Sequence, residues 1–270
     1  MRYVSFPGLR VLTSPLASAT LFAMASLRQI DSGMISACVG RCQPKKRFLI
    51  TRYLMTTTLK WPPWIGKEYA SSSSRTLIVG ESFYLWEGED EAPEILDNSN
   101  FLQALMQNNI LRGMADVKQD VRAHRNFERA IFQTSHPSDA EAHALWNRLA
   151  YHVLVQRPLP NARTRPTGED FLDGWRLLLQ VIRELQPRNI IVWGVTAAYT
   201  IEAALQTSPF RVQNLHCHEP IGRTPPRTAT LAGDYPIRVV FIHHPSKYFN
   251  WKKWGLFLRE KLPEPFGTSG

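Results

Sequence analysis

Acid–base and hydrogen-bonding side chains directly follow four apolar, β-prone runs of this 270-residue sequence. The segments are Gly80-Glu81-Ser82-Phe83-Tyr84, His152 with Gln156-Arg157-Pro158, Gly194 with Thr196, and His244-Pro245-Ser246. Carboxylates and imidazoles are the groups that proteins use most often for general acid–base catalysis. None of the four segments is a Walker loop, a G-x-G-x-x-G fingerprint or a nucleophile elbow. The chemistry of this chain is therefore sought in acid–base groups at the strand ends.

The segments around these residues predict the elements that must position them. Apolar runs predict strands over 75–80, 150–155, 189–193 and 237–242. Helical spacing of apolar residues and capping residues predict helices over 95–114, 117–132, 138–149, 167–185, 196–205 and 251–262. Strands that alternate with helices predict an α/β fold, a three-layer sandwich whose central parallel sheet has about four strands.

The four segments are predicted to meet at one edge of this sheet. Ligands of an open parallel sheet bind outside the carboxyl ends of its strands, because the loops converge there. The residues just past each strand are therefore the first place to look for a site.

The same motifs, in this order and spacing, resemble the uracil-DNA glycosylase superfamily over about residues 75–260. Gly80-Glu81-Ser82-Phe83-Tyr84 is similar to the first motif of the superfamily, and His244-Pro245-Ser246 is similar to its second catalytic motif. Tyr151–Pro158 resembles the base-reading strand and Arg-Pro loop of the iron–sulfur members. Ile190–Ala198 is similar to their central strand and the helix after it. The resemblance implies a glycosylase-like α/β domain in which Glu81, Tyr84, His152 and His244 line one pocket.

This resemblance implies a DNA glycosylase-like hydrolase that removes uracil or another damaged base by cleaving an N-glycosidic bond. It implies two catalytic residues: Glu81, which would orient a water or stabilise the cationic sugar, and His244, which would donate a hydrogen bond to the leaving base. The implied substrate-binding residues are Gly80, Ser82, Phe83, Tyr84, His152 and Ser246. The implied DNA contacts are Arg157, Lys247, Tyr248, Phe249, Lys252 and Lys253, with Arg163 and Arg165 as further phosphate ligands.

Several positions depart from the pattern of the superfamily. Ser82 stands where members carry Asp, Asn or Ala, and a serine hydroxyl is not a general base at neutral pH. His152 replaces the Asn whose amide distinguishes uracil from cytosine. The cluster cysteines have no counterpart, because Cys38 and Cys42 lie more than thirty residues before the first strand. We therefore expect a site without a cofactor.

These departures leave other functions open. One alternative is a non-catalytic member of the same fold that binds nucleic acid or a nucleotide. Another is a protein-interaction domain whose acidic, aromatic loop 81–94 docks a partner. Ordinary structural roles also remain open: Phe83 and Phe249 as core residues, Glu81 as a solvated loop acid, and His244 as a helix cap.

The basic character of the chain is concentrated near its N-terminus. The formal net charge is +9, but residues 1–54 hold eight Lys and Arg against Asp31 alone. Subtracting them from 32 basic and 23 acidic residues leaves 24 against 22, a net charge of +2 for the rest. We predict a basic, disordered extension or targeting segment over 1–54, a linker over 55–74 and a glycosylase-like domain over 75–265.

Cysteine and histidine usage predicts neither disulfides nor a metal. Three cysteines cannot form a closed disulfide set, which favours an intracellular protein, nuclear or cytoplasmic, with a mitochondrial destination left open. The pair Cys38 and Cys42 lacks further ligands. His216 and His218 share one side of an extended segment and are interpreted as ordinary strand histidines. We expect a monomer that binds DNA and no membrane.

Overall fold

The computed structural model describes residues 58–85, 92–111 and 121–262. The predicted extension over 1–54, with Cys38 and Cys42, lies outside the described residues, as does much of the acidic loop 81–94. No helix within the described ranges is long and apolar enough to cross a bilayer.

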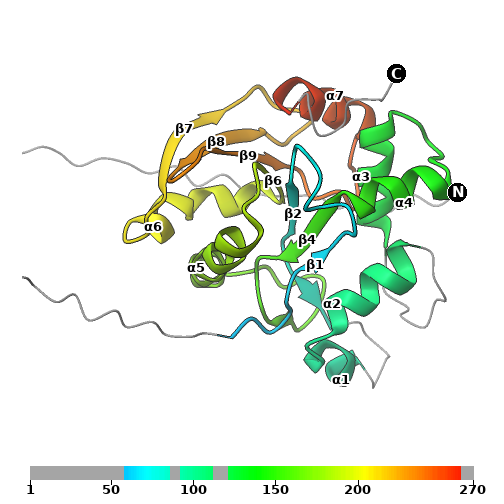
Figure 1. Ribbon diagram of the computed structural model, residues 1–270, viewed down its shortest axis with the longest axis horizontal. Coiled ribbons are helices and arrows are strands. Elements are labelled where there is room, and N and C mark those ends of the chain that lie inside the picture. The colour runs from blue at the N-terminus through cyan, green and yellow to red at the C-terminus, as the bar shows by residue number, and fades with distance from the viewer. Residues whose placement is uncertain (1–57, 86–91, 112–120, 263–270) are drawn as a thin grey trace, which may run out of the picture. The chain divides into compact units, whose positions relative to one another are not determined.

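A seven-stranded mixed sheet forms the centre of the domain, in the order β1-β4-β2-β6-β9-β8-β7 (Figure 1). The strands are β1 (Trp64–Ile65), β2 (Thr76–Gly80), β4 (Leu149–Val153), β6 (Asn189–Trp193), β7 (Arg211–Cys217), β8 (Arg227–Ala232) and β9 (Ile237–Ile242). The inner strands β4, β2, β6 and β9 are parallel. The antiparallel pairs are β1 with β4, β8 with β9, and β7 with β8. A separate parallel pair joins β3 (Phe83–Tyr84) to β5 (Pro158–Leu159).

Helices cover both faces of the sheet. One apolar core contains Ile78, Ile191 and Val240 from the strands, and a second contains their alternate neighbours, such as Val79 and Val192. Because side chains alternate along a strand, these two cores lie on opposite faces. The first face carries α1 (Ala92–Asp97), α2 (Phe101–Ala104), the π-helix η1 (Leu105–Ile110), α3 (Arg122–Phe132), α4 (Asp139–Asn147) and α7 (Trp251–Lys261). The second face carries α5 (Gly168–Leu185), the 3₁₀ helix η2 (Val195–Tyr199) and α6 (Ile201–Leu205).

The predicted α/β class with helices on both faces is confirmed, whereas the predicted number of strands was too small. All four predicted strands form the parallel centre of the sheet. The three additional strands pair antiparallel with their neighbours, and their sequences lack the continuous apolar run of a strand that is buried on both faces. β7 is largely exposed, and β8 alternates buried with half-buried residues.

Residues 58–74 pack into the domain, although they were predicted to be part of a linker. β1 pairs with β4, and Trp61, Trp64 and Tyr69 are buried. The indole N–H of Trp61 donates to the carbonyl of Leu96. The sequence signal for a linker was misleading here because the Pro and Ser residues surround large aromatic side chains.

Two of the predicted helices are interrupted. The helix expected over 95–114 divides into α1, α2 and η1, and the backbone N–H of Asn100 is bound by the side chain of Asn98 between the first two. Such local side-chain bonds compete with the helical hydrogen bonds of the backbone. The helix expected over 196–205 begins as η2 and continues as α6.

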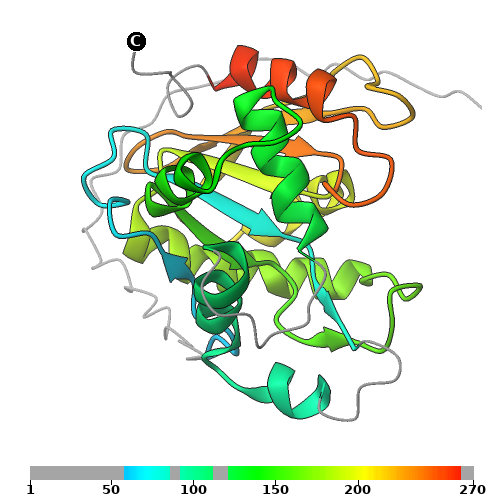
Figure 2. The same cartoon turned by 90° about the vertical axis from the view of Figure 1, so that its right-hand side faces the viewer.

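Helix α3 packs closely against α7, as both ribbon views show (Figures 1 and 2). Gly255 makes this possible, because a Cβ at that position would lie 2.0 Å from the carbonyl oxygen of Ala130. The guanidinium of Arg259 then donates to the carbonyl of Ile131. This contact fixes α3 relative to the segment between β9 and α7, which carries the second predicted motif.

Candidate active site

A cleft of about 1160 Å³ opens at the carboxyl ends of β2, β6 and β9. It brings together twelve of the residues that the sequence singled out: Glu81, Ser82, Phe83, Tyr84, Arg163, Arg165, Gly194, Thr196, His244, Ser246, Lys247 and Tyr248. The two motifs come from strands on either side of β6, yet they line one cavity. The convergence expected from the parallel topology therefore holds for Glu81, Tyr84 and His244.

His152 does not line the cleft, contrary to the prediction. It lies on β4 between Tyr151 and Val153, which face the first core, so alternation turns its side chain toward the α5 face. It is fully buried there, and burial lowers the pKa of its imidazole to about 3. The residue of β4 that enters the cleft is the preceding Tyr151.

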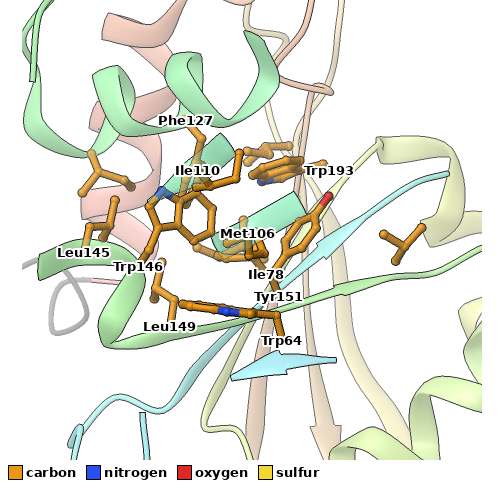
Figure 3. Close-up of a cluster of buried hydrophobic side chains, with 14 of the residues drawn as sticks. Trp64, Ile78, Met106, Ile110, Phe127, Leu145, Trp146, Leu149, Tyr151 and Trp193 are labelled. Carbon is orange, nitrogen blue, oxygen red and sulfur yellow. The ribbon is translucent and has the colours of Figure 1, made fainter. Parts of the chain in front are cut away.

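Gly80 has no side chain, and this leaves space for the side chain of Tyr151. A Cβ at Gly80 would lie 2.5 Å from the Tyr151 hydroxyl, so the glycine lets this phenol reach the cleft wall. Gly80 itself is buried at the end of β2 and does not line the cavity. Figure 3 shows Tyr151 in a buried cluster with Trp146, Phe127 and Trp193. The cleft therefore has a rigid aromatic wall on this side.

Glu81 is a buried carboxylate in the cleft. Only 9% of the residue is exposed, and none of the described residues donates a hydrogen bond to its side chain. Burial raises the pKa of the carboxyl group, and the positive charge of Arg165 offsets part of this rise. A carboxylate that burial makes a stronger base is suited to accept a proton from water. The interpretation as a solvated loop acid is thus wrong.

Gly194 leaves the space that the Glu81 carboxylate occupies. The glycine follows β6 with a φ of 125°, and a Cβ there would lie 2.3 Å from Oε2 of Glu81. This backbone conformation and this approach both require glycine.

Substitution of Gly194 tests the position of the carboxylate. We expect Gly194→Ala to reduce stability by about 1–3 kcal/mol, because alanine is strained at this φ, and to displace Glu81. Thermal unfolding measures the first effect. The matched control is Gly168→Ala, since a Cβ at Gly168 meets no atom within 4 Å. Equal stability of the two variants would contradict the described geometry.

His244 faces the cleft beside Trp193, with its ring centroid 6.2 Å from that of the indole. Burial lowers the pKa of His244 to about 4, and the positive charges of His243 and Arg165 act in the same direction. The imidazole is therefore neutral at physiological pH and presents one N–H donor. No side-chain hydrogen bond to a described residue occupies it.

Helix α3 holds the His244 segment in place. The buried side-chain amide of Asn126 donates to the carbonyls of Pro245 and Ser246, at 2.8 and 3.0 Å. The next histidine is fixed by its own contacts: His243 bonds the Thr224 hydroxyl through Nδ1 and lies against Phe249. His243 is thus a structural histidine, whereas the ring of His244 is left for a ligand.

His124 is a cleft residue that the sequence analysis missed. It lies on α3, is 4% exposed, and neither ring nitrogen has a hydrogen-bond partner among the described residues. Aromatic rings surround it: its centroid lies 5.0 Å from that of Tyr151 and 5.1 Å from that of Trp193. Burial lowers the pKa of His124 to about 3, and the charges of Arg125 and His244 contribute. The cleft therefore holds two neutral imidazoles.

Further polar atoms in the cleft wall also lack partners. The Ser82 hydroxyl and the Trp193 indole N–H are buried, and neither is hydrogen-bonded to a described residue. Buried polar groups without partners are rare in proteins and call for a ligand or water. Together with His124 and His244, they make the cleft rich in hydrogen-bond donors.

The rim of the cleft is basic, though not at every predicted position. Arg163, Arg165 and Lys247 line it and are exposed. Arg157 instead forms a bidentate ion pair with Asp170, with both N–O distances at 2.7 Å. Its guanidinium therefore serves to fix the Arg-Pro loop to α5.

The residues after the second motif divide into exposed and buried positions. Tyr248 is 96% exposed at the rim, in a left-handed conformation with φ of 61°. Phe249 is buried and stacks on Trp254, so the predicted DNA contact at Phe249 is wrong and the core interpretation holds. Lys252 and Lys253 are exposed in the first turn of α7, outside the cleft.

No group of three or more metal-binding side chains occurs in the described part of the chain. His216 and His218 lie on β7 with ring centroids 4.4 Å apart, and His218 bonds the Thr228 hydroxyl. This pair has the strand position that the sequence predicted.

No protein-family model matches the chain, and no curated protein matches it.

Proposed function

We propose that this chain is a DNA glycosylase-like hydrolase that removes uracil or another damaged base by hydrolysing its N-glycosidic bond. One observation carries the proposal: a buried carboxylate, Glu81, and a neutral imidazole, His244, line one cleft from separate strand ends. Cleavage of this bond needs these two groups, an acceptor for the proton of water and a donor for the leaving base.

In the first half of the reaction, Glu81 orients a water molecule toward the anomeric carbon of the sugar. The bond from this carbon to the base nitrogen breaks, and the electron pair stays on the base. The sugar passes through an oxocarbenium-like state that the negative charge of Glu81 stabilises. As the water oxygen bonds to carbon, Glu81 accepts its proton.

In the second half, His244 stabilises the departing base. The base leaves as an anion, and the N–H of the neutral imidazole donates a hydrogen bond to the base oxygen that carries the charge. The low pKa of His244 suits this role, because the ring stays neutral through the cycle and donates without having to lose a proton. Arg165, whose charge acts on both Glu81 and His244, is the residue that we propose binds a phosphate of the same nucleotide.

His124 takes the role of base recognition that the resemblance assigned to position 152. Its ring is presented by α3 into the cleft, beside the wall formed by Tyr151 and Trp193. A neutral imidazole and an indole N–H offer donors to base oxygens. Uracil, hypoxanthine and xanthine carry such oxygens, whereas cytosine and adenine carry amino groups at the corresponding edge. The unpaired indole N–H of Trp193, which can only donate, would therefore favour an oxo group over an amino group at this edge.

The proposal is tested by incubating the purified full chain with single-stranded DNA that contains uracil, hypoxanthine or xanthine. Free base is measured by chromatography, and the same oligonucleotides with only ordinary bases serve as controls. We expect release from at least one damaged substrate. Release from none of the three would reject the proposed reaction for these bases.

Tyr248 is expected to contact the DNA next to the extruded nucleotide. At the rim of the cleft, Tyr248 has an exposed ring and a strained backbone conformation. Stacking of a base on an aromatic side chain contributes about 1–3 kcal/mol to the free energy of binding. Tyr248→Ala should therefore weaken binding of single-stranded DNA by about tenfold or more without reducing thermal stability. Fluorescence anisotropy measures the affinity. Leu256→Ala is the control, an exposed residue of α7 that does not line the cleft, and an equal loss there would contradict the prediction.

A second candidate is a non-catalytic member that binds nucleic acid or a nucleotide in the same cleft. It is favoured by Ser82, where the superfamily has other residues, and by the absence of His152 from the cleft. Salt-dependent binding of single-stranded DNA without release of any base would select this function.

A further inference from the structure

A second cavity lies at the opposite edge of the sheet, where the parallel strands begin. It has a volume of about 460 Å³, and its wall includes Arg75, Arg188, Arg238, Asn189 and Tyr235. Arg75 and Arg188 directly precede β2 and β6, and Arg238 is the second residue of β9. These three strands are neighbours in the sheet, so the topology gathers the arginines. We call this cavity the arginine pocket.

The three guanidinium groups of the arginine pocket have no acidic partner among the described residues. Within the described residues, none of them forms an ion pair or donates a hydrogen bond, and no acidic residue lines the cavity. Only the backbones of the three residues are bonded to one another, Arg188 N–H to Arg75 C=O and Arg238 N–H to Arg188 C=O. Most other described arginines bond a carboxylate or a carbonyl, as Arg157 and Arg259 do.

Five unpaired arginines of the described chain line the arginine pocket or the cleft. Three of them line the arginine pocket, and Arg163 and Arg165 line the cleft. Arg183 and Arg223 line neither cavity. Like charges held together at one cavity repel one another, and an anion that bound among them would relieve this repulsion. The planar guanidinium fork matches the oxygens of a phosphate.

Asn189 adds a hydrogen-bond acceptor to the arginine pocket. Its side chain is 3% exposed, and its amide N–H groups donate to the carbonyl of Ser74 and the hydroxyl of Thr76. The Oδ1 atom on the same amide has no partner among the described residues. An acceptor beside three cations suits a ligand that carries an N–H or O–H donor as well as phosphate.

We propose that the arginine pocket binds a phosphorylated ligand with a hydroxyl or amino donor, which is the chemistry of a nucleotide. The arginines would hold the phosphates, and Asn189 would accept from a sugar hydroxyl or a base amino group. The volume lies in the range of small-molecule sites. The site is separate from the cleft and does not depend on the proposed hydrolase activity.

Calorimetric titration of the full chain with ADP, inorganic pyrophosphate and a short single-stranded DNA tests this proposal. The test variant is the double substitution Arg188→Ala with Arg238→Ala. Its matched control, Arg176→Ala with Arg183→Ala, removes the same charge from exposed positions of α5 outside both cavities. We expect the test variant to bind ADP about tenfold or more weakly than the control, and pyrophosphate to bind less tightly than ADP. A larger loss for DNA than for ADP would identify the nucleic-acid backbone as the source of the phosphate.

Three outcomes would overturn the proposal. Equal losses of ADP affinity in the test and control variants would show that binding responds to net charge alone. Loss of ADP binding in Arg163→Ala with Arg165→Ala, and not in the test variant, would place the anion in the cleft. Absence of binding for all three ligands would likewise reject the site.

Discussion

Substitution of Glu81 by Gln is expected to lower the rate of base release by about a hundredfold or more, the range for loss of a general base. The amide keeps the shape of the side chain beside Gly194 but cannot accept a proton from water. Single-turnover release of the base measures the effect. Glu202→Gln, an exposed acid on α6, is the matched control and should leave the rate unchanged.

The same variant should not lose stability. Burial raises the pKa of Glu81, so the folded state favours the protonated form and its charged form destabilises the fold above that pKa. Glu81→Gln removes this charge, so its Tm at pH 7 should equal or exceed that of the parent chain. At a pH below the ordinary value of 4.5 the difference should vanish, because both side chains are then neutral. A lower Tm together with full activity would show that Glu81 has a structural role only.

The raised pKa also predicts the pH dependence of the reaction. Activity requires the Glu81 carboxylate and the neutral His244. His244 is already neutral above about pH 4, so the acid limb should follow Glu81 and lie above 4.5. An acid limb that persists unchanged in Glu81→Gln would assign it to another group.

Substitution of His244 by Ala should lower the rate of base release by about a hundredfold or more, the scale for losing one donor to a developing anion. The affinity for DNA should change much less, because the donor acts on the leaving base in the transition state. Rates at saturating enzyme separate the two effects.

The sequence provides its own control for His244. His136-Pro137-Ser138 repeats the same tripeptide, but there Ser138 caps α4 and His136 is exposed outside the cleft. His136→Ala should therefore leave the rate of base release unchanged. Equal rates for the His244 and His136 variants would remove His244 from the mechanism.

The parallel centre of the fold could be predicted because its strands are continuous apolar runs. Ile190-Ile191-Val192 and Val239-Val240-Phe241 are buried on both faces, and few other structures accommodate such runs. β7 has no such signal, because it is an exposed edge strand whose polar residues pair only with β8. β1 has only two residues, which is too short for a periodic pattern.

The site could be predicted where residues directly follow a strand and not where a helix supplies them. Glu81 and His244 follow their strands, and parallel topology alone brings such ends together. His124 enters from α3, where it stands on the apolar stripe three residues before Phe127 and seven before Ile131. A polar residue on such an apolar stripe is the sequence feature from which His124 could have been predicted as a site residue. The prediction that His152 lines the cleft failed because successive side chains of a strand point to opposite faces of the sheet.

Release of free base by the parent chain and by the double variant Glu81→Gln with His244→Ala tests the central claim most directly. Both proteins are incubated in excess over single-stranded DNA containing uracil, hypoxanthine or xanthine, and the abasic site is revealed by alkaline cleavage. The account predicts abasic sites with the parent chain on at least one substrate, and none above background with the double variant, which should still bind the DNA. Equal cleavage by the two proteins would contradict the assignment of the cleft as the active site.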